Sequence, residues 1–172
     1  GDLNIIAEDL GSVMDKVIQL RDTTGFPGMK VLQFAFDPEG DSIEMPHNHS
    51  NNVVAYTGTH DNDTILGWYE NETTPASRAF LDKYSNRRDD ETVHHALFRL
   101  LFGSPAFMAV VTMQDLLGLD GSARMNLPNT LGGNWTWRMT ADQLTPEIEA
   151  ELLDLTETYR RVNVHLVNEK SE

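Results

Sequence analysis

The fold is decided by the stretch Val53-Val54-Ala55-Tyr56-Thr57-Gly58-Thr59-His60-Asp61-Asn62-Asp63, in which an apolar run ends in a polar cluster. An apolar run of this length that stops at a glycine predicts a buried β-strand. Three further runs also end in polar residues, namely residues 4–8 at Glu8, residues 29–37 at Asp37, and residues 107–113 before Gln114 and Asp115. We therefore predict four strands whose carboxyl ends carry polar side chains.

Segments with helical periodicity lie between and after the predicted strands. Their apolar spacing and their start signals predict helices over residues 13–20, 75–85, 90–102 and 146–165, the first with Ser12 as N-cap. This alternation predicts parallel βα units rather than hairpins. The carboxyl ends of parallel strands meet at one edge, which carries the active site of a barrel and the ligand of an open sheet.

The composition of the chain excludes several classes of protein. Its 172 residues include 13 Lys plus Arg and 27 Asp plus Glu, so the formal net charge is −14. Such an acidic chain is a poor partner for nucleic acid or for an anionic membrane, both of which need a basic surface. The chain has no cysteine, which excludes a disulfide scaffold, a thiolate metal site and a cysteine nucleophile.

Neither a membrane span nor a secretion signal is predicted. No stretch approaches the roughly 18–20 apolar residues that a membrane helix needs, and no basic segment is followed by an apolar one as in a leader peptide. We therefore expect a cytoplasmic protein. The chain begins at Gly1 without an initiator Met, directly before a predicted strand, so we also expect it to be a piece of a longer protein.

Glu8 and Asp61 are the first candidates for catalysis. Two carboxylates that face one cleft can cleave a glycosidic bond, one as general acid and the other by stabilising or attacking an oxocarbenium-like centre. The alternative is that these acids only cap helices and solvate loops, which is what Asp and Glu commonly do where strands end.

A metal site is a second possibility at the same strand end. His60, Asp61 and Asp63 are residue types that bind metals, and they could serve a metal-dependent hydrolase. Adjacent residues of an extended segment point in opposite directions, however, and the spacing is not that of a calcium loop. We therefore expect neither a metal nor a cofactor.

Aromatic side chains accompany the predicted loops. Trp68, Tyr69, Trp135 and Trp137 lie in or beside loops rather than at core spacing. Together with Asp, Glu, His and Asn, such side chains suit a carbohydrate cleft, because sugar rings stack on aromatic faces. The alternative is that these aromatic residues close the ends of the core.

Four longer motifs carry a resemblance to a known family. They are Ile6-Ala7-Glu8-Asp9-Leu10-Gly11, Gly25-Phe26-Pro27-Gly28-Met29-Lys30-Val31-Leu32-Gln33-Phe34, Tyr56-Thr57-Gly58-Thr59-His60-Asp61-Asn62-Asp63-Thr64, and Arg124-Met125-Asn126-Leu127-Pro128 with Gly133-Asn134-Trp135-Thr136-Trp137-Arg138. In this order they resemble the 4-α-glucanotransferases, the amylomaltase or disproportionating-enzyme family, which is related to the α-amylases. The resemblance extends from residue 2 to about residue 165.

The resemblance implies a retaining mechanism on a TIM (β/α)8 barrel that acts on maltooligosaccharides and other α-1,4-glucans. By motif, Glu8 resembles the acid/base of the family and Asp61 resembles its transition-state stabiliser. Further positions would bind the glucan, namely His60 at the cleavage site and Asp37, Asn126 and Phe34 along the cleft. An acid must hold its proton near neutral pH, so we expect Glu8 to lie in a drier setting than Asp61.

The resemblance also implies that this chain is incomplete as a catalyst. About four parallel βα units would be strands five to eight of the barrel, so residues 1–172 would form the C-terminal half of the catalytic domain. No Asp matches the motif of the family's nucleophile, so we expect the N-terminal half to precede Gly1 and the chain to be inactive alone. The alternatives are a non-catalytic carbohydrate-binding fragment and the metal-dependent hydrolase. Open barrel edges predict self-association.

Overall fold

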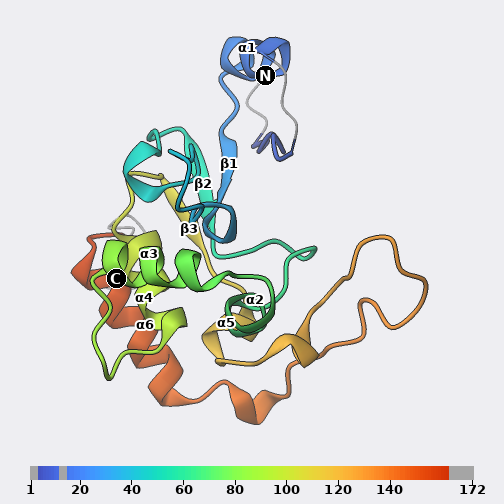
Figure 1. Ribbon diagram of the computed structural model, residues 1–172, viewed down its shortest axis with the longest axis vertical. Coiled ribbons are helices and arrows are strands. Elements are labelled where there is room, and N and C mark those ends of the chain that lie inside the picture. The colour runs from blue at the N-terminus through green and yellow to red at the C-terminus, as the bar shows by residue number, and fades with distance from the viewer. Residues whose placement is uncertain (1–3, 12–14, 163–172) are drawn as a thin grey trace, which may run out of the picture.

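The computed structural model describes residues 4–11 and 15–162 and has an α/β architecture. Three parallel strands lie in the order β1 (Gly28–Val31), β2 (Val53–Tyr56) and β3 (Met108–Val110), as Figure 1 shows. The α-helices are α1 (Asp15–Thr24), α2 (Ile65–Asn71), α3 (Pro75–Ser85), α4 (Val93–Phe102), α5 (Met113–Leu116) and α6 (Pro146–Thr158). Four 3₁₀ turns complete the elements, at Leu32–Phe34, Pro46–Asn48, Gly121–Ala123 and Ala141–Gln143.

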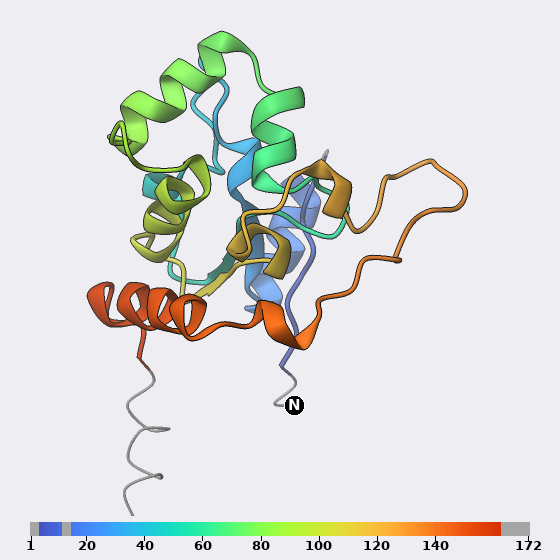
Figure 2. The ribbon, with the colours of Figure 1, turned by 90° about the horizontal axis from the view of Figure 1, so that it is seen from below.

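Both strand pairs are parallel, as the sequence predicts. Val53 of β2 is in register with Gly28 of β1, and Val54 is in register with Met108 of β3. The core lies between this sheet and helices α2, α3, α4 and α6, of which α4 packs against the other three (Figure 2). In α4 the residues 93, 96, 97 and 101 recur on one face, and all four are buried, which is the pattern of a helix against a core.

The predicted strand over residues 4–8 is absent, which corrects the prediction of four strands. This segment has no regular secondary structure, although Ala7 N–H donates to the carbonyl of Pro27 at 2.8 Å, beside the start of β1. The next donor along β1, Met29 N–H, goes to the carboxylate of Asp9 at 2.8 Å instead of to a backbone carbonyl. The Asp9 side chain thus accepts the hydrogen bond that the backbone of a fourth strand would have to accept in order to pair with β1.

The predicted strand over residues 29–37 is also shorter than expected. β1 ends at Val31, whose N–H donates to the carboxylate of Glu44 at 2.8 Å, and a 3₁₀ turn follows. Lys30 pairs with the other oxygen of Glu44 at 3.0 Å. Glu44 therefore joins the end of β1 to the loop that precedes β2.

The helix over residues 75–85 is confirmed as α3, where the Thr74 side chain accepts from Ser77 N–H. The helices predicted over 90–102 and 146–165 correspond to α4 and α6, with α6 ending at Thr158. The first predicted helix corresponds to α1, which continues to Thr24 beyond the predicted end at residue 20, and its N-cap candidate Ser12 lies outside the described residues. Helix α2 was not predicted, although Thr64 caps it in the ordinary way by accepting from Gly67 N–H.

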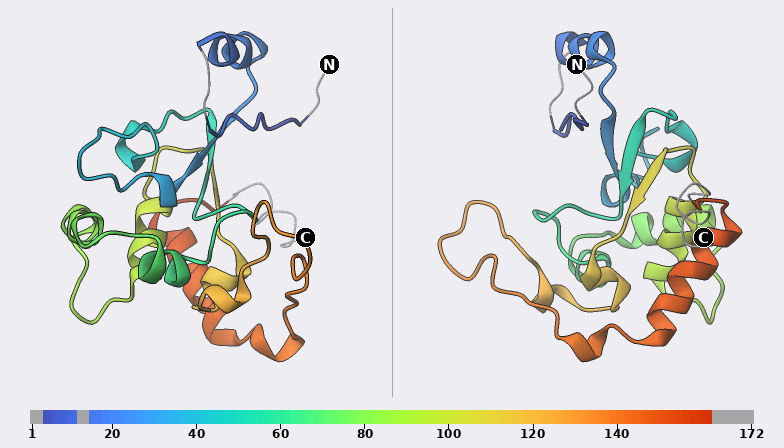
Figure 3. Two further views of the ribbon diagram at one scale, coloured as in Figure 1. Left: turned by 45° about the vertical axis from the view of Figure 1, so that its right-hand side comes forward. Right: turned by 180° about the vertical axis from the view of Figure 1, so that it is seen from behind.

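The elements lie unevenly around the sheet. Helix α1 stands away from the other helices, at the end of the molecule where β1 begins (Figure 1 and Figure 3). The segment between residue 127 and the turn Ala141–Gln143 forms a long loop that projects from the body (Figure 2). Within the described residues, no helix combines the length and the apolar character needed to cross a membrane.

A buried carboxylate joins the ends of two strands to a helix. Asp115 is 2% exposed. It accepts hydrogen bonds from the Thr57 hydroxyl and from Ile65 N–H, both at 2.7 Å. Burial raises the pKa of Asp115, an effect that the bonds from Ile65, Thr57 and Thr112 oppose. The turn between β2 and α2 is therefore anchored at both of its ends.

Replacing this carboxylate is expected to destabilise the chain. Asp115→Ala leaves the buried donors of Thr57 and Ile65 without an acceptor, which should lower the free energy of unfolding by about 2–4 kcal/mol. Asp115→Asn keeps one acceptor and should cost less. Urea unfolding followed by circular dichroism measures both, with Asp154→Ala on the exposed side of α6 as the matched control. Equal stability of Asp115→Ala and the control would contradict the anchoring role.

His94 makes the stability of the fold depend on pH. It is buried on α4, and burial lowers its pKa from 6.5 to about 4. Between these values the unfolded chain binds a proton that the folded chain does not, so stability falls as the pH drops from about 6.5 to about 4, by at most about 1.4 kcal/mol per unit. His94→Phe should flatten this slope in denaturation measured across that range. His60→Gln, at a half-exposed histidine outside α4, should leave this slope unchanged, and an unchanged slope in His94→Phe would refute the assignment.

Candidate functional site

An open cleft of about 1210 Å³ lies at the carboxyl ends of the strands. Its walls come from the segment before α1, from β1 and the turn after it, from the turn that follows β2, and from residues near 124. Four of the residues predicted from the sequence line it together, namely Glu8, Phe34, His60 and Asp61. The convergence expected at this edge of the sheet is therefore present for these four.

The turn after β2 presents His60 and Asp61 to the cleft. Asn62 shapes this turn, because its side-chain oxygen accepts from both the N–H and the hydroxyl of Thr59, at 2.8 and 2.9 Å. Asp61 N–H donates in turn to the Thr59 hydroxyl at 3.2 Å. At Gly58 a Cβ would lie 2.9 Å from the side-chain nitrogen of Gln33. A side chain at residue 58 would therefore require the Gln33 amide, which donates to the backbone oxygen of Asp63 at 2.7 Å, to shift.

The carboxylate of Asp61 is half exposed and has two polar neighbours at one of its oxygens. Asn126 Nδ2 donates to its Oδ1 at 2.6 Å, and His60 Nε2 lies 3.4 Å from the same oxygen. The His60 ring packs against the exposed Trp135, with ring centroids 5.0 Å apart. Asp61 thus keeps an exposed charge beside a polar donor and an aromatic surface.

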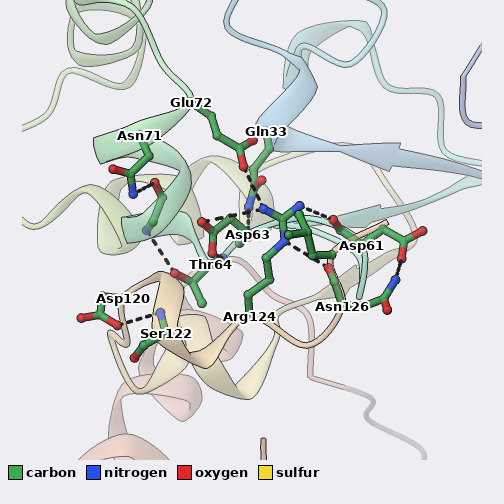
Figure 4. Close-up of polar contacts among 12 residues, drawn as sticks. Gln33, Asp61, Asp63, Thr64, Asn71, Glu72, Asp120, Ser122, Arg124 and Asn126 are labelled. Carbon is green, nitrogen blue, oxygen red and sulfur yellow. Dashed lines mark hydrogen bonds and ion pairs between the residues drawn. The ribbon is translucent and has the colours of Figure 1, made fainter. Parts of the chain in front are cut away.

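Arg124 holds this arrangement together, as Figure 4 shows. Its Nη2 donates to the backbone oxygen of Asp61 at 2.7 Å, and its Nε donates to the backbone oxygen of Asn126 at 3.0 Å. Its Nη1 donates to the Glu72 carboxylate at 3.0 Å and lies 3.9 Å from Asp63. Sequence reasoning gave Arg124 no role, although its place two residues before Asn126 in the fourth motif was the available signal.

Glu8 lines the cleft from the segment that precedes α1. The neighbouring Asp9 fastens this segment, because its carboxylate accepts from Met29 N–H and pairs with Arg21. Glu8 itself is exposed, as is Asp61. In the described part of the chain both carboxylates are open to solvent, and the drier setting expected for Glu8 stays a prediction for the full-length protein.

Asn126 and Asp37, which are also predicted to bind the glucan, are not among the residues that line the cleft. Asn126 contacts Asp61 directly, as described above. Asp37 is not brought to the cleft: its carboxylate accepts from Glu39 N–H at 3.0 Å in an exposed turn and borders a separate cavity of about 230 Å³. Phe34 is half exposed and borders both spaces.

The described residues contain no group of three or more His, Asp or Glu side chains arranged to hold a metal ion. Asp63 turns away from His60 and Asp61, since its carboxylate accepts from Thr64 N–H at 2.8 Å and faces Arg124. The metal-dependent alternative therefore has no geometric support in this part of the molecule.

Two of the aromatic residues belong to the core, whereas another is exposed where a sugar ring could stack on it. Trp68 is buried in the core against Phe36, and the partly buried Tyr69 packs against the same core. Both have a structural role. Trp135 remains exposed beside His60 and is available to a ligand.

Comparison with known proteins gives a consistent result. A family model described as 4-alpha-glucanotransferase matches residues 1–145. The 4-alpha-glucanotransferase of Streptococcus pneumoniae is 62% identical over 170 residues, which are 99% of this chain and 34% of that protein. The corresponding protein of Thermus thermophilus is 45% identical over 169 residues, or 94% of this chain and 34% of the relative.

Solved structures have the same fold. The amylomaltase of Streptococcus agalactiae, determined in complex with acarbose, matches with a TM-score of 0.91 and 44% identity over 95% of this chain and 33% of its own. The amylomaltase of Corynebacterium glutamicum is 19% identical with a TM-score of 0.60 over 87% of this chain and 27% of its own, and shows the fold alone. The chain spans about a third of the length of the relatives with 62% and 45% identity.

Proposed function

The chain belongs to the 4-alpha-glucanotransferase family, and we propose that it carries the acid/base part of an enzyme that transfers α-1,4-glucan segments between maltooligosaccharides. One observation carries the proposal: Glu8 and Asp61 line the same open cleft, which also presents His60 and Phe34. Acarbose, bound in the structure of a relative, is proposed to occupy this cleft as well.

The two carboxyl groups receive different roles in a retaining double displacement. Protonated Glu8 donates its proton to the glycosidic oxygen as the bond to the leaving glucan breaks and the anomeric carbon bonds to a carboxylate nucleophile outside this chain. In the second half-reaction the carboxylate of Glu8 takes the proton of the acceptor sugar's hydroxyl, whose oxygen bonds to the anomeric carbon and displaces the nucleophile. The carboxylate of Asp61 stabilises the positive charge that develops on the sugar ring in both transition states.

The remaining predicted residues are proposed to bind the glucan. His60 and Asn126 adjoin Asp61 and can hydrogen-bond the hydroxyls of the sugar at the cleavage site. Phe34 is half exposed and offers an aromatic face to the same cleft. Asp37 lies beyond Phe34, beside the smaller cavity, and is proposed to contact a sugar further from the cleavage site.

We also propose that the nucleophile lies outside residues 1–172. No Asp of this chain matches the nucleophile motif, and the relatives are about three times as long as the matched segment. The strands β1, β2 and β3 would then be strands six to eight in the C-terminal half of a (β/α)8 barrel, and the segment at Glu8, which has no regular secondary structure here, would occupy the place of strand five. Residues 1–172 would be a partial catalytic domain.

A second candidate function is carbohydrate binding without catalysis. The exposed Trp135 and Phe34 beside an open cleft favour it, since aromatic faces bind sugars whether or not a bond is cleaved. Calorimetric titration of the 172-residue chain with maltooligosaccharides separates a binding segment from an inert one.

Removing the proposed acid should abolish transfer. In the full-length protein, Glu8→Gln should lower maltotriose disproportionation by roughly 10²–10⁴-fold, the usual contribution of a general acid/base. Asp61→Asn should lower it by roughly 10²–10³-fold, since a developing charge loses its counter-charge. Glu39→Gln, at an exposed position outside the cleft, serves as the control.

Normal rates in Glu8→Gln would refute the assignment of Glu8 as the acid/base. Robust disproportionation by the 172-residue chain alone would refute the proposal that the nucleophile lies outside this chain.

The unpaired strands should make the 172-residue chain self-associate. In the sheet of the described residues, β3 pairs only with β2, and β1 also has only one strand neighbour. Phe107 and Met108, at the start of β3, are 53% and 44% exposed. Because unpaired edges and apolar surface promote association, sedimentation velocity should show a sedimentation coefficient that rises with concentration. A monodisperse monomer at every concentration tested would count against the half-barrel proposal.

A further inference from the structure

We propose that Arg124 is a positioning residue for Asp61, fixing the main chain of the turn that carries this carboxylate without pairing with the carboxylate itself. The inference rests on the proposed function, because it concerns how Asp61 performs its role there. Arg124 is only partly exposed, with 21% of its side chain accessible, and its guanidinium lies between the turn after β2 and helix α2 (Figure 4).

Three residues close a ring of hydrogen bonds around the carboxylate. Arg124 donates to the backbone oxygens of Asp61 and of Asn126, and the Asn126 side chain donates to Asp61 Oδ1. A further backbone bond, from Asn126 N–H to the oxygen of His60 at 3.0 Å, ties the two segments directly. The planar guanidinium presents its donors in a fixed geometry, so the ring holds the Asp61 turn and the Asn126 segment in one relative position.

The ion pairs of Arg124 point to the same role. Its charge is met by Glu72, at the end of α2, and more distantly by Asp63. The carboxylate of Asp61 receives a neutral donor instead. A direct guanidinium pair would offset the negative charge that Asp61 is proposed to present to the sugar, whereas a bond to the backbone oxygen leaves that charge available.

Arg124 also borders the cleft, so direct sugar binding is the competing explanation. The two explanations predict different kinetics. Displacement of a positioned charge should lower kcat while KM changes little, because a small misplacement can cost up to about 10²-fold in rate. Loss of a direct sugar contact that is equal in ground and transition states should raise KM and leave kcat unchanged.

The experiment compares variants of the full-length protein in maltotriose disproportionation. Arg124→Met keeps the aliphatic stem but removes every donor, and should lower kcat by roughly tenfold or more, with KM within about threefold of the wild type. Arg124→Lys keeps the charge and one donor group, and should give an intermediate kcat. Glu70→Gln, at an exposed acid of α2 that lines neither the cleft nor the smaller cavity, is the matched control, and its kcat should stay within about threefold of the wild type.

A further variant separates positioning from folding. Asn126→Ala opens the same ring at another point and should also lower kcat, with a melting temperature close to that of the wild type. The proposal is overturned if Arg124→Met keeps a kcat within about twofold of the wild type, or if its effect is confined to KM. It is also overturned if Arg124→Met fails to fold while Asn126→Ala retains the wild-type kcat. An inactive wild-type protein would instead refute the proposed function on which the inference rests.

Discussion

The position of the cleft residues depends on the buried carboxylate of Asp115. It follows β3, yet it binds the Thr57 hydroxyl after β2 and Ile65 N–H at the start of α2. The turn between Thr57 and Ile65 carries His60 and Asp61, so a single carboxylate fixes both ends of the segment that faces the cleft. Burial opposes the ionised form of Asp115, and hydrogen bonds to it favour that form.

The carboxylates of this acidic chain differ in the partners that bind them. The carboxylates of Asp9 and Glu44 each accept a hydrogen bond from a backbone N–H of β1, and each is also paired with a cation. Asp61 differs from these two because its carboxylate accepts from a neutral amide, and the nearby guanidinium of Arg124 bonds to its main chain. Asp9 and Glu44 are thus each paired with a cation, whereas the carboxylate of Asp61 in the cleft remains half exposed.

Sequence reasoning predicted much of this architecture and part of the site. The parallel order of the strands, helix α3 and the polar turn after β2 follow from apolar runs, start signals and glycine, and the structure confirms them. The same pattern could not distinguish a carboxylate in the cleft from one in the core. Asp61 and Asp115 both follow apolar runs, and only the tertiary packing makes the second a buried acceptor.

The failures have local physical causes. The run at residues 4–8 is apolar enough for a strand, but Asp9 takes the N–H of Met29 that a backbone ladder would use. Asp37 follows its apolar run as Asp61 does, yet a 3₁₀ turn ends β1 early and carries Asp37 away from the cleft. The role of Arg124 was not predicted, since two of its partners are main-chain oxygens, and such bonds leave no pattern of residue types beyond its place beside Asn126 in the fourth motif.

The central claim is that Glu8 and Asp61 act on the same sugar from one cleft. A crystal structure of the full-length protein with bound acarbose tests it most directly. The account predicts that the ligand lies in this cleft with both carboxylates within hydrogen-bonding distance, about 3 Å, of the sugar units on either side of the cleavage position. Acarbose bound elsewhere, or one carboxylate turned away from the bound ligand, would contradict the account.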